Sequence, residues 1–532
     1  MKKLFLVLAA AILGLNTLYS QQHIYYDDLS GERKIQTVLS LISSQYVDTF
    51  NQGRLIEEAI RKMLKELDPH SVYMTKQELQ EANEPLLGNF EGVGIQFNIL
   101  NDTILVVATI PGGPSEKLGI LAGDKIIKIN NEEAFGKKIN NNFVMKRLRG
   151  EKGTKVTVAI YRKGKKELID YIITRDKIPL TSIDATYMAA PEVGYIKLNR
   201  FSKTSISEFY EAMGKLKQEG MKYLILDLRD NTGGFLDVAV DLSDEFLNAG
   251  KLIVYTEGLR SFRFDYKSTE KGSFEQGRLA ILINENSASA SEIVSGAIQD
   301  WDRGIIIGRR SFGKGLVQKP FGLPDGSAIR LTTARYYTPT GRCIQKSYKE
   351  GADNYYKDLQ NRYKHKEYVN PDSIKFPDSL KYYTKNKRVV YGGGGIMPDI
   401  FIPLDTSFYS DYYSNILRKG TIYQFTLQFV NDNRAMLKDK YKTIKNFNKD
   451  FSIDDAFLKI FTDYSEAQGV KLDEKGLQNS KEYIILNLKA LIARNIWNID
   501  AFFEVFNTKD VTMKKAIELL KGNDLKKYKI SY

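Results

Sequence analysis

A serine-rich segment and a lysine flanked by glycines are the residues of this chain best suited to covalent chemistry. The segment Ser287-Ala288-Ser289-Ala290-Ser291-Glu292 opens a predicted helix, and Lys314 follows its middle serine by 25 residues. A serine hydroxyl becomes a nucleophile when a base removes its proton, and a neutral lysine can replace histidine as that base. The pattern predicts a hydrolase in which Ser289 is the nucleophile and Lys314 is the general base.

Lys314 can serve as a base only if its amine is neutral at the working pH. Burial among apolar groups lowers the pKa of a lysine, and Phe312, Leu316 and Val317 provide such neighbours. Gln318 lies four residues beyond Lys314, so it can share a face with the lysine and orient the amine. We therefore expect a buried lysine held in line by a neighbouring side-chain amide.

The same residues also have ordinary structural interpretations. Ser289 and Glu292 fit a capping box, which only starts a helix, and Lys314 could be a solvated lysine in a glycine loop. The stretch 308–314 matches the first seven positions of a phosphate-binding loop, but Gly315 stands where serine or threonine must bind magnesium. The serine cluster and the lysine taken together favour the hydrolase over these alternatives.

The segment Asp227–Gly234 ends a predicted strand with a glycine pair that opens a helix. Backbone N–H groups at such a turn can stabilise the negative charge that develops on oxygen during acyl transfer. An ordinary strand-to-helix loop has the same pattern. Taken alone, this segment leaves both interpretations open.

A glycine turn near residue 92 marks the change from helical to strand patterning. Gly92-Val93-Gly94-Ile95 leads into a strand in which apolar and polar residues alternate. A glycine turn beside an exposed strand edge can bind the C-terminal carboxylate of a peptide and accept the peptide as an added strand. Residues 88–175 resemble a PDZ domain, so Gly92, Val93, Gly94 and Ile95 are the predicted peptide-binding residues. A simple tight hairpin is the alternative.

The remaining patterns divide the chain into regions. Residues 21–87 are predicted to be helical, and residues 176–345 alternate strands with helices, which indicates a layered α/β core that resumes at 389–403. Residues 346–388 are rich in Tyr, Lys, Asp and Asn with little periodicity, which indicates an insertion. Residues 404–532 are predicted to be helical and contain no recognisable motif.

Composition excludes several classes of protein. The chain has 532 residues, of which 42% are hydrophobic, so several folded domains are expected. Its net charge of +13 is not concentrated in one basic block, which favours solvated faces over a nucleic-acid surface. Cys343 is the single cysteine, and only three histidines are present, so internal disulfides and a zinc site are not expected. We predict no metal and no cofactor.

Residues 1–20 have the pattern of a secretory signal peptide. Lys2 and Lys3 precede an apolar run from Leu4 to Leu15, and Ser20 is a small residue at the predicted cleavage point. The apolar run is shorter than the roughly 20 residues that span a bilayer, which disfavours an uncleaved anchor. The sequence therefore predicts an exported protein.

Residues 30–403 together resemble the carboxyl-terminal processing proteases, also called tail-specific proteases. The strings Ser-Ala-Ser-Ala-Ser-Glu and Phe-Gly-Lys-Gly-x-Val-Gln carry most of this resemblance. It implies a crotonase-like α/β protease core with an inserted PDZ domain and a helical N-terminal segment, to which the helical C-terminal region is added. The site residues that it implies are Ser289 as nucleophile, Lys314 as base, Gln318 as its orienting amide, Gly233 or Gly234 with Ala290 as oxyanion donors, and His70 as a structural residue.

The resemblance implies a periplasmic serine endopeptidase whose PDZ domain binds the free C-terminus of a substrate protein. No nucleic-acid partner is expected, whereas membrane association, an adaptor protein and a homo-oligomer are all compatible with it. The alternative from a different class is a non-catalytic PDZ scaffold that only tethers protein C-termini. The presence of Ser289, Lys314 and Gln318 argues against that scaffold.

Overall fold

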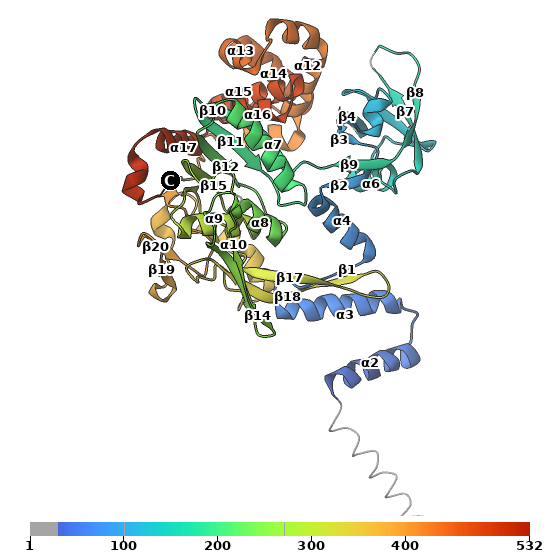
Figure 1. Ribbon diagram of the computed structural model, residues 1–532. Coiled ribbons are helices and arrows are strands. Elements are labelled where there is room, and N and C mark those ends of the chain that lie inside the picture. The colour runs from blue at the N-terminus through green and yellow to red at the C-terminus, as the bar shows by residue number, and fades with distance from the viewer. Residues whose placement is uncertain (1–29, 101, 163, 271, 532) are drawn as a thin grey trace, which may run out of the picture. The chain divides into compact units, whose positions relative to one another are not determined.

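The computed structural model describes residues 30–100, 102–162, 164–270 and 272–531. These residues form two compact units, which meet in sequence between Leu67 and Asp68. The first unit contains the helices α2 (Gly31–Gln45) and α3 (Gln52–Leu67) (Figure 1). The second unit holds every residue that the sequence assigns to a site.

The second unit begins with β1 (Val72–Met74) and α4 (Lys76–Leu87) and continues as a small antiparallel domain. A ribbon of β2 (Asn89–Gly92) and β9 (Asp176–Pro179) forms both its entry and its exit. Ile104 and Val106 of β4 and Val156, Val158 and Ile160 of β7 belong to its core, because side chains two apart along a strand point to the same face. Its other elements are β3 (Ile95–Leu100), β4 (Thr103–Thr109), α5 (Pro114–Lys117), β5 (Lys125–Ile129), β6 (Glu132–Glu133), α6 (Asn141–Leu148), β7 (Lys155–Tyr161) and β8 (Ile169–Thr174).

A six-stranded sheet in the order β10-β11-β12-β15-β16-β21 forms the centre of the α/β core. Only β10 and β11 pair antiparallel, and the other neighbours are parallel, as the alternation of strands and helices predicts. The strands are β10 (Ile183–Ala190), β11 (Val193–Leu198), β12 (Tyr223–Asp227), β15 (Leu279–Ile283), β16 (Ile305–Gly308) and β21 (Ile400–Phe401). The layered α/β fold class is confirmed.

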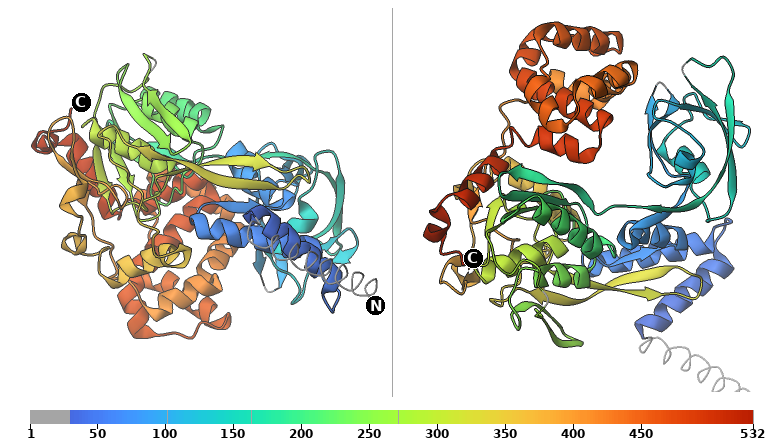
Figure 2. Two further views of the ribbon diagram at one scale, coloured as in Figure 1. Left: turned by 90° about the horizontal axis from the view of Figure 1, so that it is seen from below. Right: turned by 45° about the horizontal axis from the view of Figure 1, so that its top comes forward.

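Helices cover both faces of this sheet, so its central strands β11, β12, β15 and β16 are almost completely buried. Ile281 and Ile283 of β15 pack with α7 (Ser205–Gln218), α8 (Leu236–Asp244) and α9 (Ala290–Asp300). Ala280 and Leu282 of the same strand pack with α17 (Val511–Lys521). Figure 2 shows this C-terminal segment, in red, against the sheet. The end of the chain is therefore one layer of the core.

A second sheet includes the strand that follows Lys314. It joins β1, β18 (Ala328–Tyr337), β13 (Leu252–Gly258) and β14 (Ser261–Lys267), with β17 (Leu316–Gly322) also paired to β18. β17 begins two residues after Lys314. The strand pair β17–β18 thus fixes the C-terminal side of the loop that contains Lys314.

The predicted insertion is an ordered segment. It contains α10 (Ala352–Lys364), the short 3-10 turns Pro371–Ser373 and Asp378–Leu380, and β19 (Lys381–Tyr383), which pairs with β20 (Val389–Tyr391). The following helices have a hydrophobic core of their own. They are α11 (Asp411–Lys419), α12 (Thr421–Lys440), α13 (Ile444–Asp450), α14 (Asp455–Ala467), α15 (Glu474–Ile496) and α16 (Ile499–Phe506), and a last 3-10 turn spans Asp524–Tyr528.

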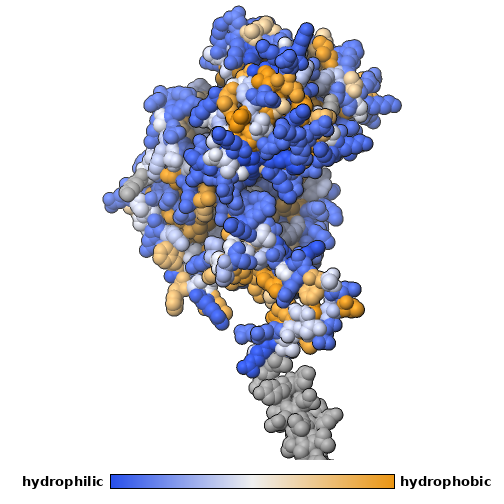
Figure 3. Space-filling view, turned by 90° about the vertical axis from the view of Figure 1, so that its right-hand side faces the viewer, coloured by the Kyte–Doolittle hydropathy of each residue, from blue (hydrophilic) through white to orange (hydrophobic). Residues whose placement is uncertain are grey.

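The face of the molecule drawn in Figure 3 is mainly hydrophilic, with groups of apolar side chains among the polar ones. Ile35, Val38 and Leu41 of α2 are each about half exposed. Among the described helices, none combines the length and the apolar character needed to cross a membrane. The predicted signal segment, residues 1–20, lies outside the described residues.

Candidate active site

Ser289 occupies the sharp turn between β15 and α9. Its φ of +57° is rare for a residue with a Cβ atom, and such strain is concentrated at functional sites. Ser289 is half-buried, whereas Ser287 and Ser291 are fully buried and donate their hydroxyls to the carbonyls of Leu228 and Asn231, both at 2.8 Å. Of the three serines in the cluster, Ser289 is thus the accessible one.

A buried glutamate joins the candidate nucleophile Ser289 to Lys314. Glu292 Oε2 accepts the backbone N–H groups of Ser289 and Lys314, each at 2.9 Å, so the two nitrogens lie at most twice that distance apart. Glu292 Oε1 accepts the N–H of Gly313 at 2.7 Å and the hydroxyl of Ser311 at 2.5 Å. Burial raises the pKa of Glu292, and these four hydrogen bonds oppose that shift. The expected capping box is present, and its carboxylate also holds the lysine loop.

A buried tyrosine links the same two residues through their carbonyl groups. The Tyr336 hydroxyl, from β18, contacts the backbone oxygens of Ser289 at 3.1 Å and Lys314 at 2.5 Å. Burial raises the pKa of Tyr336 far above its ordinary value, so the hydroxyl stays a donor. Sequence reasoning missed Tyr336, because it lies 47 and 22 residues from its partners and no local pattern marks it.

The surroundings of Lys314 favour its neutral form. Burial lowers the pKa of Lys314 to about 8, and the positive charge of Arg330 acts in the same direction. The carboxylates of Glu292 and Asp68 oppose this shift. A large fraction of the amine is therefore neutral near pH 8, as a general base requires.

The hydrogen bond expected between the candidate base and the candidate nucleophile is not formed in this structure. Within the described part of the chain, no hydrogen bond joins the Lys314 amine to Ser289 Oγ. Gln318 donates its amide to Thr332 Oγ1 at 3.2 Å, and Thr332 in turn donates to Asp68 at 3.0 Å. The fold brings Ser289 and Lys314 together but leaves their side chains unaligned. Catalytic hydrogen bonds often tighten only when substrate is bound.

The N–H groups of the two candidate oxyanion glycines differ in their partners. The N–H of Gly233 donates to Asn231 Oδ1 at 2.9 Å, whereas those of Gly234 and Ala290 have no acceptor among the described residues. A Cβ added to Gly233 would lie only 2.8 Å from Ser289 Cβ and 3.0 Å from Ala290 N. The glycine turn therefore lies against the candidate nucleophile, and the N–H groups of Gly234 and Ala290 are donors without an acceptor in the described part of the chain.

The C-terminal region holds the segment that leads to these glycines. Arg229 forms ion pairs with Asp227 at 2.7 Å and with Asp510 at 2.6 Å, and the Asp510 carboxylate also caps α17. The Tyr195 hydroxyl donates to Asp227 at 2.8 Å. Burial opposes the charge on Asp227, but Arg229 and Lys197 keep the pKa of that carboxyl well below its usual range. This contact gives the C-terminal helix a place beside the candidate oxyanion segment.

His70 makes its contacts with the insertion. Its Nε2 lies 2.8 Å from the hydroxyl of Tyr355 on α10, and the two rings meet edge to face. Burial and the nearby charge of Lys314 lower the pKa of His70 to about 4, so its ring is neutral at the pH where Lys314 titrates. These contacts fit the structural role implied for His70.

A groove between β3 and α6 contains three of the four predicted peptide-binding residues. Its cavity of about 330 Å³ is lined by Val93, Gly94 and Ile95 together with Phe90, Gln96, Phe97, Val144, Met145, Leu148 and Arg149. Gly92 lies outside this lining, in the ribbon strand β2, where it pairs with Asp176. Gly94 has a φ of +75°, and an added Cβ would lie 3.0 Å from Ile178 Cδ1, so the turn needs glycine there.

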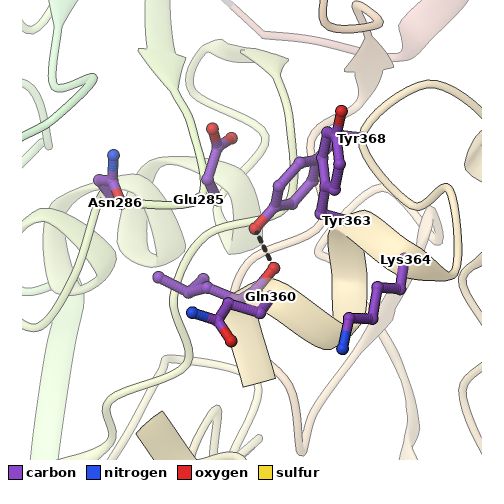
Figure 4. Close-up of a pocket in the computed structure, with 7 residues that line it drawn as sticks. Glu285, Asn286, Gln360, Tyr363, Lys364 and Tyr368 are labelled. Carbon is purple, nitrogen blue, oxygen red and sulfur yellow. Dashed lines mark hydrogen bonds between the residues drawn. The ribbon is translucent and has the colours of Figure 1, made fainter. Parts of the chain in front are cut away.

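Another cavity, of about 460 Å³, lies between α10 and the loop that precedes Ser289. Figure 4 shows Glu285 and Asn286 of the loop with Gln360, Tyr363 and Lys364 of the helix around it. Neither catalytic candidate lines this cavity. Within the described ranges, no group of three or more His, Cys, Asp or Glu residues could hold a metal ion.

Four family models match this chain. Peptidase family S41 matches residues 192–353, and a PDZ domain matches residues 92–173. The N-terminal domain of the activating protease CtpB matches residues 13–78, and a family of unknown function matches residues 412–498. The S41 match covers the core from β11 to β18, and the PDZ match covers the groove-bearing domain from β3 to β7.

Individual proteins also resemble the chain. It is 39% identical over 315 residues to a carboxy-terminal-processing protease of Bartonella bacilliformis, a match that covers 58% of this chain and 71% of that protein. It is 35% identical over 321 residues to a probable CtpA-like serine protease of Staphylococcus aureus, covering 60% of this chain and 63% of that protein. Among solved structures, a photosystem II D1 C-terminal processing protease has 25% identity and a TM-score of 0.37, covering 71% of this chain and 89% of that one.

Proposed function

Because the chain belongs to the carboxyl-terminal processing protease family, we propose that it is an exported serine endopeptidase of the serine–lysine type. Its substrates are proteins with free C-termini, which the PDZ domain binds. Export to the periplasm is part of the proposal and rests on the signal pattern of residues 1–20.

The observation that carries this proposal is the shared anchoring of Ser289 and Lys314. One carboxylate oxygen of Glu292 holds the N–H groups of both residues, and one hydroxyl of Tyr336 contacts both of their carbonyls. A helix cap alone has no need of a partly buried lysine whose pKa is lowered to about 8. The arrangement suits a base that must act on this serine.

The reaction begins when neutral Lys314 removes the proton from Ser289 Oγ as that oxygen attacks the peptide carbonyl. In this proposal the N–H groups of Gly234 and Ala290, which have no acceptor among the described residues, stabilise the resulting oxyanion. The Lys314 ammonium then gives its proton to the leaving amine, so an acyl-enzyme forms and the C-terminal product departs. Lys314 next activates a water molecule, which hydrolyses the ester and restores the Ser289 hydroxyl.

The PDZ groove supplies recognition of the substrate. The carbonyls of Val93 and Gly94 accept the N–H groups of Ser115 at 3.2 Å and Ile110 at 2.9 Å, which fixes the glycine turn beside the groove. A peptide can then add to the edge of β3 while its carboxylate meets the amides of that turn. Apolar lining residues such as Phe97 and Val144 favour an apolar C-terminal side chain.

A peptide with an apolar, free C-terminus tests the proposal. Incubation of the mature protein with this peptide, followed by mass spectrometry, is expected to give defined internal cleavage products. A non-catalytic PDZ scaffold would bind the same peptide and leave it intact. Binding without cleavage across pH 7 to 10 would therefore rule out the protease and retain the scaffold.

A further inference from the structure

The loop that carries Lys314, residues Ser311–Gly315 and here called the lysine loop, is tied to the nucleophile through its amides. The N–H groups of Gly313 and Lys314 bind Glu292, and the N–H of Phe312 binds the carbonyl of Ser287 at 3.0 Å. These bonds explain how one side of the lysine loop is fixed. They leave its carbonyl groups to be bound elsewhere.

The inserted segment binds three consecutive carbonyls of the lysine loop. Arg362 of α10 donates from Nη1 to the carbonyl of Ser311 at 2.8 Å and from Nη2 to that of Phe312 at 3.0 Å. The backbone N–H of Lys346 donates to the carbonyl of Gly313 at 2.9 Å. The insertion is therefore in direct contact with the backbone just before the candidate base.

Arg362 is well suited to fix this backbone. Its side chain is 2% exposed, and Asp358, one helical turn earlier, forms an ion pair with its guanidinium at 2.9 Å. A guanidinium is planar and presents its N–H donors in a fixed fork, so it can hold two neighbouring carbonyls at once. Lysine at this position could bind only one of them well.

The same segment keeps water away from the lysine loop. The Lys346 ammonium lies 3.9 Å from the ring centre of Phe312 and 4.2 Å from that of Tyr355, and it donates to Asp358 at 2.9 Å. The rings of Phe312 and Tyr355 contact each other edge to face. Burial is the main cause of the low pKa of Lys314, so a loop released from these contacts would lose part of that burial.

We propose that Arg362 is a positioning residue of the reaction, acting through the carbonyls of Ser311 and Phe312 on the placement and hydration of Lys314. The inference rests on the proposed role of Lys314 as general base. Arg362 itself contacts neither the reacting atoms nor the Lys314 amine. It gives the inserted segment a function that sequence patterns do not reveal.

Two substitutions in the full-length protein test this role. Arg362→Ala removes both donors and is expected to lower kcat by about 100-fold, because a misplacement of about 1 Å can cost that much. Arg362→Lys keeps the charge and one donor and is expected to lower kcat by about 10-fold. KM and the affinity for a free-acid peptide are expected to stay within about twofold, because the PDZ groove is unchanged.

Lys364→Ala is the matched control. Lys364 lies two residues further along α10, is exposed, and points toward the cavity shown in Figure 4. This substitution also removes one positive charge from the helix but touches no carbonyl of the lysine loop. Its kcat is expected to equal that of the wild type.

Competitive acetylation of lysines followed by mass spectrometry gives a readout that does not depend on activity. In Arg362→Ala the pKa of Lys314 is expected to rise from about 8 toward the ordinary 10.5, as water reaches the loop. Lys346, whose pKa burial also lowers to about 8, is measured separately on its own peptide. The other titratable or charged groups facing Lys314 keep their identity in these variants: Glu292, Arg330, Asp68 and His70.

Wild-type kcat together with an unchanged Lys314 pKa in Arg362→Ala would overturn the positioning role. If Arg362→Ala does not fold, Arg362→Lys decides, and wild-type values in that variant overturn it equally. A failure of the proposed function is distinguishable, because the wild-type protein would then bind the peptide without cleaving it, or Lys314→Ala would cleave it at the wild-type rate. Loss of activity in Lys314→Ala with normal Arg362 variants would leave the protease assignment standing and remove only this inference.

Discussion

The PDZ groove and the proposed catalytic pair, Ser289 and Lys314, differ in how complete they are. The groove is an open cavity of about 330 Å³ beside a glycine turn whose carbonyls are already bound within the domain. At the catalytic pair, the backbones of Ser289 and Lys314 are held by shared partners, but no hydrogen bond joins their side chains in the described structure. The groove proposed to bind substrate is thus preformed, whereas the proposed chemical step needs the Lys314 amine to align with Ser289 Oγ.

The difference has a physical basis in the groups that each site uses. The groove relies on backbone amides and apolar side chains, which keep their character without a ligand. A lysine base depends on burial, and burial also limits how freely its amine can approach the serine. We expect peptide binding to persist when turnover is lost, and the following experiments separate the two properties.

The largest expected effect comes from the nucleophile. Ser289→Ala should lower peptide cleavage by at least about 10⁴-fold while leaving peptide affinity unchanged, since the hydroxyl is lost and the groove is not. Mass spectrometry measures cleavage, and calorimetry measures binding. Cleavage by Ser289→Ala at the wild-type rate would refute the assignment.

Ser287→Ala and Ser291→Ala are the matched controls. Their buried hydroxyls bind backbone carbonyls, so each substitution should lower the free energy of unfolding by about 1–2 kcal/mol. Both variants should retain most of their activity. Loss of activity without loss of stability in either variant would point to a different nucleophile.

The base gives the next largest effect and a defined pH dependence. Below a pKa of about 8 Lys314 is protonated and cannot accept the serine proton, so kcat should rise with pH through about 8. Lys314→Arg should lower kcat by about 10³-fold at every pH, because guanidinium stays protonated. A pH profile of kcat in the wild type and the variant checks both expectations. A pH-independent wild-type kcat would contradict the mechanism.

Sequence patterns predict the parts of this protein that are local. The strings around Ser289 and Lys314, the glycine turn at Gly94 and the alternation of strands and helices each lie within a short stretch, and the family and the α/β fold class are confirmed. The sequence also predicts a role for Glu292, but only as part of a helix cap. Its second role depends on where the fold places the lysine loop.

The supporting residues could not be predicted, because they come from distant parts of the chain. Arg229 and Asp510 are 281 residues apart, and Arg362 lies 50 residues beyond Phe312. An arginine on an amphipathic helix has the same local pattern whether it meets solvent or two buried carbonyls. The sequence of the C-terminal helix α17 likewise shows no motif, although its apolar residues pack against one face of the central sheet.

Recognition of the substrate carboxylate gives a moderate effect. An amidated peptide offers the glycine turn a neutral acceptor in place of a charged one, which weakens its hydrogen bonds. We expect kcat/KM to fall by about 10-fold relative to the free-acid peptide, and the dissociation constant for Ser289→Ala to rise by a similar factor. Equal kcat/KM values for the two peptides would show that the groove does not recognise the C-terminal carboxylate.

Gln318 gives the smallest expected effect and tests whether alignment of the lysine needs a partner. Its amide is bound to Thr332 in this structure, at the end of a chain of hydrogen bonds from Asp68, so it can orient Lys314 only by leaving or sharing that bond. Gln318→Ala should lower kcat by about 5-fold with little change in melting temperature, whereas the neighbouring exposed Lys319→Ala should change neither. Gln318→Glu sharpens the test, because a carboxylate near the amine would raise the pKa of Lys314 and move the rise of kcat to higher pH. An unchanged pH profile in Gln318→Glu, measured on the free-acid peptide, would place Gln318 too far from Lys314 to orient it.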